Sequence, residues 1–312
     1  MGLESEPLNP EPALHEANSA GAKPLSAWLM LLATGGIWGI TFSLAKLVTE
    51  AGAHPLGISW WQAVIGGGLT LAYSVLRKAV PPLTRQHAIF YLVCGALGTA
   101  IPGTLFFYAA PHIPAGVISI TIAIVPMATL ALAVPLGLDR WEISRIAGII
   151  LGVVAVGMIV APDTSLPEAG MTFWVLVCVA ASGCYALENL WLSLRRPVGS
   201  DAFAILTGML LMATLMLTPV VFAADAFVPL FKTWGVVELS IVAMAVVNTT
   251  CYGIFIHLVT TAGPVFASQA AYLVTLSGIF WGIVIFQEQH SWWIWGALLV
   301  MMAGLALVKP RH

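Results

Sequence analysis

Charged residues are scarce in this chain. Only 8% of its 312 residues are Asp, Glu, Lys or Arg, whereas 60% are hydrophobic. A soluble globular domain carries about 25% charged residues, so the composition excludes that class. The net charge is −2 and no basic run occurs, so we expect no nucleic-acid partner. The sequence predicts an all-α polytopic membrane protein.

Patterns of side chains that carry chemistry are also missing. An intramembrane enzyme needs a nucleophile with a base, paired carboxylates or metal ligands at one depth. The sequence has no His-x-x-x-His, no Gly-x-Ser-x-Gly and no aspartate inside an apolar run. We therefore predict that the protein is not an enzyme and uses no metal or cofactor. A channel is disfavoured as well, because no apolar run contains a filter-like loop or a ring of charges.

Ten apolar runs are present, and a helix of about 20 residues crosses a bilayer. They cover residues 26–48, 56–76, 87–108, 113–135, 143–161, 171–192, 202–222, 236–259, 264–286 and 291–308. Ten of the twelve Lys and Arg residues lie in alternate gaps, on the side of the N-terminus. Because positive charge near helix ends stays cytoplasmic, we expect ten transmembrane helices with both termini in the cytoplasm.

The first 25 residues differ in kind from the rest. They hold four glutamates interleaved with Pro7, Pro10 and Pro12, and they contain no apolar run. Such a segment buries too little surface to offset its ordering entropy, so residues 1–25 are predicted to be a disordered acidic tail.

The two halves of the chain resemble each other. At a shift of 148 residues, Gly35 coincides with Gly183 and Gly148 with Gly296. This indicates two five-helix repeats, at 26–162 and 171–308. Because five is an odd number, the second repeat begins on the opposite side of the membrane from the first. The repeats must therefore have inverted topology. Inverted repeats are typical of transporters, whose binding site lies between the halves near the midplane.

Motifs in both halves resemble a known family. They are Gly36-Ile37-Trp38-Gly39-Ile40-Thr41-Phe42 with Lys46, Ile113-Pro114-Ala115-Gly116 with Pro126, Leu138-Asp139-Arg140 with Gly148, Ala262-Gly263-Pro264, and Phe286-Gln287-Glu288 with Gly296. Over residues 28–308 the chain resembles the EamA branch of the drug/metabolite transporter superfamily. It departs from the pattern in Asp139-Arg140, where Glu-Arg is usual, and in lacking a second counterpart of Pro126.

The resemblance implies a ten-helix exporter of amino acids or other small metabolites in the bacterial inner membrane, similar to the YddG-type amino-acid exporters. It also implies that spans 1, 3, 4, 6, 8 and 9 line a cavity. We expect a small-molecule substrate and the lipid bilayer as partners, and a monomer rather than a dimer.

Polar side chains inside the spans mark candidate substrate contacts, because they are costly in hydrocarbon. Three helices each present an amide near a tyrosine, at spacings of three or four residues that share one helix face. Amides suit the ammonium and carboxylate of a zwitterion; the alternative role is interhelical hydrogen bonding. The candidates are Trp38, Tyr108, Tyr185, Asn189, Asn248, Tyr252, Gln269 and Tyr272.

Three further residues are candidates for coupling or gating. Glu188 lies deepest of the acidic residues, and it either carries a coupling proton or pairs with Arg195 or Arg196 at the interface. Lys46, near the outer end of the first span, either snorkels to water or acts at the outer mouth. Pro126 removes a hydrogen bond in the middle of the fourth span, which predicts a hinge.

The absences also restrict the substrate. No Lys or Arg lies mid-membrane, which disfavours phosphorylated sugars and nucleotides. The first span has no central carboxylate, as a pump for cationic drugs would be expected to have. The prediction is a secondary transporter that exports aromatic or other neutral amino acids by alternating access. The alternative is export of nucleosides, drugs or other neutral metabolites; uniport and proton antiport both remain open.

Overall fold

The computed structural model describes residues 25–137, 142–162, 165–168, 170–197, 200–231, 234–262, 267 and 269–308. Across these ranges the secondary structure is helical, without strands, and every predicted span falls on one helix or on consecutive helices. The predicted tail, apart from Leu25, and the Asp139-Arg140 motif lie outside the described residues.

The helices follow one another with short connections. In chain order they are α2 (Leu25–Trp38), α3 (Ile40–Glu50), α4 (Pro55–Leu76), α5 (Arg85–Gly95), the π-helix η2 (Ala96–Ala100), α6 (Ile101–Ala109), α7 (Ala115–Ile122), α8 (Val125–Ala133), α9 (Ile143–Val160), α10 (Met171–Arg195), α11 (Ala202–Ala223), α12 (Val236–Thr261), α14 (Ala270–Phe286) and α15 (Trp292–Leu307).

Length and composition suit these helices to a membrane. Among the described residues, seven segments, each made of one helix or of consecutive helices, are long and apolar enough to cross a bilayer. α14 and α15 are shorter apolar helices. α4 has 22 residues but is less apolar, because Gln62, two tryptophans and several glycines dilute it. Large apolar side chains such as Leu299 of α15, 71% exposed, cover the outside. Such a surface belongs in lipid.

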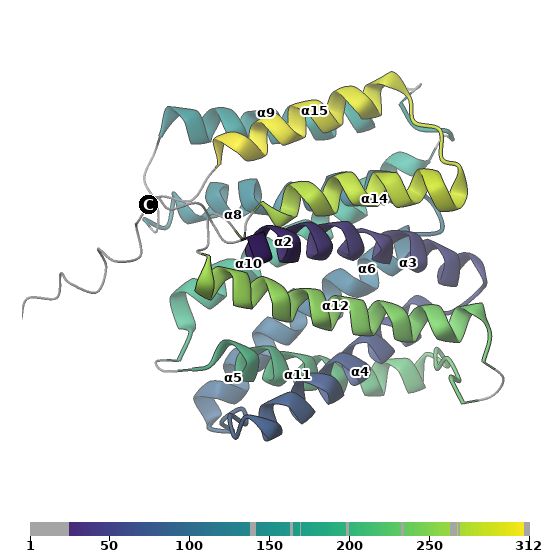
Figure 1. Ribbon diagram of the computed structural model, residues 1–312. Coiled ribbons are helices and arrows are strands. Elements are labelled where there is room, and N and C mark those ends of the chain that lie inside the picture. The colour runs from purple at the N-terminus through teal and green to yellow at the C-terminus, as the bar shows by residue number, and fades with distance from the viewer. Residues whose placement is uncertain are drawn as a thin grey trace, which may run out of the picture.

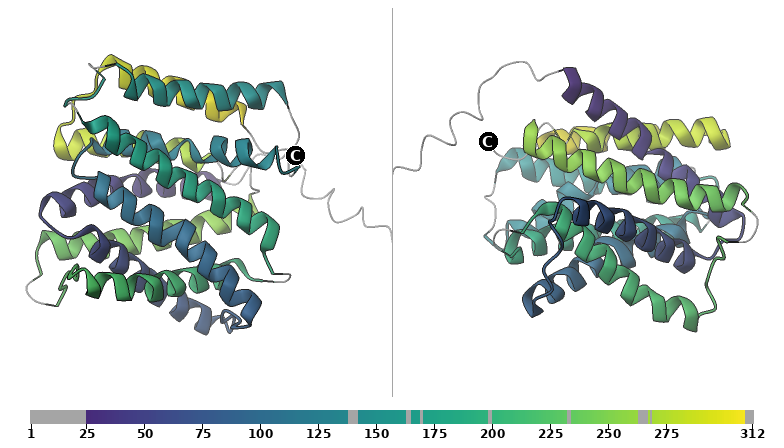
Figure 2. Two further views of the ribbon diagram at one scale, coloured as in Figure 1. Left: turned by 180° about the vertical axis from the view of Figure 1, so that it is seen from behind. Right: turned by 60° about the horizontal axis from the view of Figure 1, so that its bottom comes forward.

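The helices lie side by side, roughly parallel to one axis (Figure 1). α9 packs against α15 at one edge, and α4 packs against α11 at the opposite edge, an arrangement that is also visible from behind (Figure 2). Between these edges, α14 contacts α2, α3 and α7, while α10 contacts α6, α7 and α8. The start of α2 and the end of α15 lie toward the same end of the bundle (Figure 1).

Three of the predicted spans are interrupted. The first, predicted as one run over 26–48, divides at Gly39 into α2 and α3. The third contains the π-helix η2, and the fourth divides at residues 123–124, so Pro126 is the second residue of α8. Proline is tolerated in the first turn of a helix because its missing N–H has no partner there.

α14 satisfies backbone carbonyls next to the interruption at Gly39. Ser277 Oγ donates to the carbonyl of Gly35 at 2.6 Å, and Trp281 Nε1 donates to that of Gly36 at 2.9 Å. The approach is close: a Cβ at Gly39 would lie 2.5 Å from the backbone nitrogen of Gly278. Only a glycine at position 39 allows this packing.

We therefore predict that Gly39→Ala separates α14 from α2 and α3. Overpacking of a tight contact costs about 1–3 kcal/mol, so the unfolding temperature of the detergent-solubilised protein should fall. Gly36→Ala is the matched control, because a Cβ there meets no atom within 4 Å. Circular dichroism during heating measures both variants, and equal unfolding temperatures for the two would contradict the packing argument.

Candidate functional site

A hydrogen-bonded chain of side chains joins α2, α4 and α12. Trp38 Nε1 donates to Asn248 Oδ1 at 3.0 Å, and Asn248 Nδ2 donates to Gln62 Oε1 at 3.1 Å. Gln62 Nε2 donates in turn to the carbonyl of Ile241 at 2.9 Å. Each amide thus has a donor and an acceptor engaged, which fixes the orientation of all three side chains.

Aromatic rings pack beside this chain. Trp38 meets the ring of Tyr252 edge-on at 6.4 Å between centroids and that of Phe255 at 6.5 Å. Tyr252 and Phe255 are 6.3 Å apart. We call Trp38, Gln62, Asn248, Tyr252 and Phe255 the Trp38 cluster. It offers amide and phenol groups next to a large apolar wall, which is the composition of a small-molecule site.

A second group lies on α10. The ring of Tyr185 stacks on that of Phe106 at 6.1 Å, and Asn189 Nδ2 donates to Thr129 Oγ1 of α8 at 3.2 Å. Tyr185 and Asn189 therefore face α6 and α8, as their four-residue spacing on one helix face predicts.

Other predicted substrate residues lie apart from these groups. Tyr108 is 36% exposed and packs edge-on against His54 at 6.0 Å. Gln269 is the exposed N-cap residue of α14, and Tyr272 is half-buried against the main hydrophobic core. Within the described parts of the chain, no hydrogen bond or aromatic contact connects these three residues with the Trp38 cluster.

Glu188 is buried within the bundle. Its residue is 7% exposed, and its carboxyl group lies against Gly98 of η2. The expected partners at the interface are engaged elsewhere, since Arg195 lies over the Trp191 ring and Arg196 donates to the carbonyl of Ser200 at 2.7 Å. The interfacial pairing weighed for Glu188 is therefore absent.

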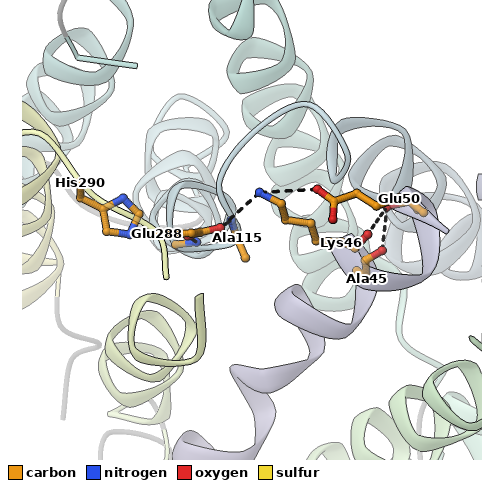
Figure 3. A network of polar contacts seen from close by, with 8 residues as sticks. Ala45, Lys46, Glu50, Ala115, Glu288 and His290 are labelled. Atoms are coloured by element: carbon orange, nitrogen blue, oxygen red, sulfur yellow. Dashed lines mark hydrogen bonds and ion pairs between the residues drawn. The ribbon is translucent and has the colours of Figure 1, made fainter. Parts of the chain in front are cut away.

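The end of the bundle at which α3 and α14 end holds a network around Lys46 and Glu288 (Figure 3). Lys46 Nζ lies 3.4 Å from Glu288 Oε1 and 3.9 Å from Glu50 Oε1. The side chain of Lys46 is only 15% exposed, so it lies within an ion-pair network rather than snorkelling to water. Its ammonium group also lies 5.2 Å from the centre of the Phe286 ring.

Glu288 connects segments that are far apart in the sequence. The backbone N–H groups of Ala115 and Gly116 donate to Glu288 Oε1 and Oε2 at 2.6 and 3.1 Å. These are the first residues of α7, whose N-cap residue Pro114 offers no side-chain hydrogen bond. A carboxylate at this place satisfies free N–H groups and complements the helix dipole.

His290 lies behind this carboxylate. Its side chain is fully buried, Nε2 lies 3.5 Å from Glu288 Oε2, and neither ring nitrogen has a hydrogen-bond partner among the described residues. Burial lowers the pKa of His290; Glu288 opposes this shift and Lys46 adds to it. The imidazole is therefore neutral at neutral pH.

A cavity of about 490 Å³ opens beside the network. Lys46, Glu50 and Glu288 line one side of it, and the stacked rings of His112 and Trp174, 4.1 Å apart, line another. Glu288 and His290 were not among the predicted site residues. The Phe286-Gln287-Glu288 motif was the available signal for Glu288, but the partners of that carboxylate lie 172 and 173 positions away.

Comparisons with known proteins agree with this picture of the chain. Residues 25–161 match the model of the EamA-like transporter family. The chain is 23% identical over 278 residues to the uncharacterized inner membrane transporter YedA of Escherichia coli K12, covering 87% of each protein. YedA of strain O157:H7 matches equally well. A protein of known crystal structure shares the fold, with a TM-score of 0.60 at 17% identity, over 92% of this chain and 98% of the other.

We predict that removing Glu288 destabilises the protein far more than removing Glu50. Glu288→Ala leaves Lys46 and two N–H groups without a buried partner, which costs about 3–5 kcal/mol. Glu50 is 44% exposed, and Glu50→Ala should cost less than about 1 kcal/mol because water screens that pair. Thermal unfolding in detergent measures both; similar losses would contradict the structural role of Glu288.

The burial of His290 leads to a prediction of how the stability of the folded protein depends on pH. An imidazole in the unfolded chain has a pKa of about 6.5, and burial lowers the pKa of His290 in the folded protein. The neutral form therefore stabilises the fold fully above about pH 6.5, and this contribution is lost as the pH falls through the lowered pKa.

Unfolding temperatures between about pH 7 and pH 5 should fall for the wild type and fall less for His290→Asn. His112→Gln, which removes an exposed histidine, should keep the wild-type slope. An unchanged slope in His290→Asn would assign the pH effect to other groups.

Proposed function

We propose that this chain exports neutral or zwitterionic small metabolites across the bacterial inner membrane by alternating access. The match of residues 25–161 to the EamA-like transporter family and the long apolar helices of the chain support this proposal. Aromatic and other neutral amino acids are the proposed substrates. The Trp38 cluster is the observation on which this proposal rests. Its residues come from both halves of the chain, with Trp38 and Gln62 in the first and Asn248, Tyr252 and Phe255 in the second.

Ten transmembrane helices in two inverted repeats, with both termini in the cytoplasm, are part of the proposal. Helix packing supports it, because the main contacts between the halves occur in matching pairs. α6 packs on α10 as α12 packs on α2 and α3, and α5 packs on α11 as α12 packs on α4. α10 contacts α7 and α8 as α14 contacts α2 and α3. The residues of the family match, 25–161, also agree with the first proposed repeat, 26–162.

The substrate site is proposed to lie at the Trp38 cluster and the neighbouring Tyr185 group. An amino acid there would exchange hydrogen bonds with Asn248 and Asn189, while the rings of Trp38, Tyr185 and Tyr252 contact its side chain. Tyr108, Gln269 and Tyr272 are proposed to meet the substrate in another conformation of the cycle.

Lys46 and Glu288 are proposed to close the outer end. Glu288 belongs to the connection between α14 and α15, whereas Lys46, Ala115 and Gly116 belong to the first half. Opening this end would break those contacts together. The interruption between α7 and α8 next to Pro126 supplies a place at which the fourth span bends.

Transport in proteoliposomes tests the proposed function. The purified protein should exchange labelled L-phenylalanine with unlabelled L-phenylalanine inside, and the flux should saturate and accelerate with internal substrate. A panel of other amino acids, nucleosides and sugars tests the substrate class. Flux of nucleosides but not of amino acids would favour the alternative substrates, and a flux without saturation or counterflow would indicate a channel.

We predict that Trp38→Phe weakens L-phenylalanine exchange while keeping an apolar ring in place. The variant removes the donor to Asn248, and a hydrogen bond contributes about 0.5–1.5 kcal/mol, so the half-saturation concentration should rise about 2- to 13-fold. Trp292→Phe, at a residue that is 90% exposed, is the matched control and should behave as the wild type. Identical concentrations for both variants would place the substrate elsewhere.

A further inference from the structure

We propose that Glu188 is the proton-binding site that couples export to proton entry. This inference rests on the proposed transport function and adds the identity of the coupling ion.

Glu188 lacks the partners that the other buried carboxylate possesses. Glu288 has an ammonium group and two backbone N–H groups within reach. Glu188, at 7% exposure, makes no hydrogen bond or ion pair within the described parts of the chain. A buried carboxylate without a partner is far more stable when it binds a proton. In a membrane protein such a residue marks an ion pathway by default.

The carboxyl group meets an unusual piece of backbone. Gly98 is the middle residue of η2, the five-residue π-helix inside the third span. A Cβ at Gly98 would overlap the carboxyl carbon and both carboxyl oxygens of Glu188. π-Helical turns are rare, and they displace carbonyl groups from their usual partners. A protonated Glu188 has an O–H donor for such a carbonyl, whereas the carboxylate has none.

Glu188 also lies between the two proposed substrate groups. Among the described residues, Cys94 of α5, Tyr185 of α10 and Tyr252 of α12 lie close enough to Glu188 to interact with it electrostatically. None of the three is a cation. Tyr252 belongs to the Trp38 cluster and Tyr185 stacks on Phe106, so a charge change at Glu188 acts directly on both groups.

Glu188 binds and releases its proton on opposite sides of the membrane. With the outer end open, one proton from outside binds a carboxylate oxygen of Glu188 and forms the neutral acid. With the inner end open, the acid releases that proton to the cytoplasm and the substrate enters its site. Glu188 lies seven residues before the last residue of α10, about 10 Å along a helix axis, so release needs access from the inner side.

Infrared spectroscopy tests proton binding without any substrate. Difference spectra of the full-length protein in lipid, recorded during a pH titration, should contain a carboxylic-acid carbonyl band that Glu188→Gln removes. Asp225→Asn is the matched control: its carboxylate is exposed, and asparagine tolerates the positive φ of 52° at that position. This control should keep the band. Glu188→Asp should shift the band, which keeps the test decisive if the Gln variant does not fold.

Flux measurements test coupling. Wild-type proteoliposomes should accumulate labelled L-phenylalanine against its gradient when their interior is more acidic than the outside, because protons that leave the interior drive the substrate inward. Glu188→Gln should lose this accumulation and retain exchange without a pH gradient, because exchange needs no net proton movement. Gradient-driven accumulation by Glu188→Gln, or a band that the substitution leaves unchanged, would overturn the proposal. If wild type transports no L-phenylalanine, the proposed function fails, and the infrared result still decides proton binding.

Discussion

The scarcity of water around the helices is the constraint on which this structure depends. A polar group that faces hydrocarbon has no solvent partner, so it must be satisfied inside the bundle. The interruption at Gly39 illustrates the consequence. Ser277 and Trp281 of α14 donate to the carbonyls of Gly35 and Gly36, so an irregular stretch of backbone persists at membrane depth. The Trp38 cluster follows the same rule, with each amide engaged on both its donor and acceptor sides.

Because of the same constraint, the interruptions are the places at which these helices bend most easily. A continuous helix forms all of its own backbone hydrogen bonds and resists bending. A helix divided at Gly39 or before Pro126 depends instead on hydrogen-bond partners in neighbouring helices, and these partners can change. These interruptions lie in the first and fourth spans, which α14 contacts from the other half of the chain. A movement of α14 therefore acts on both of them. The packing of α14 thus links the two halves.

The sequence predicts much of this architecture, because apolar length and the distribution of Lys and Arg act locally. All ten predicted spans fall on helices. Spacing also predicts which residues share a face, as Tyr185 and Asn189 do. Contacts between segments that are far apart in the sequence are harder to predict from the sequence. Nothing local to Glu288 indicates that it caps α7, and nothing near Gly98 indicates a π-helix, since both depend on three-dimensional packing. Lys46 illustrates the limit: its position near a helix end suggests snorkelling, yet it lies between the nearby Glu50 and the distant Glu288.

The two buried glutamates, Glu288 and Glu188, have different surroundings, and these surroundings are the basis for assigning them different roles. Glu288 has its charge balanced by Lys46 and by the start of α7, so it holds together segments from both halves of the chain. Glu188 has no such partner among the described residues and faces a glycine in a π-helix. Evolution could fill that space with an apolar side chain at a gain in stability. A carboxyl group without a partner destabilises the fold at this place unless it binds a ligand, and the ligand proposed here is a proton.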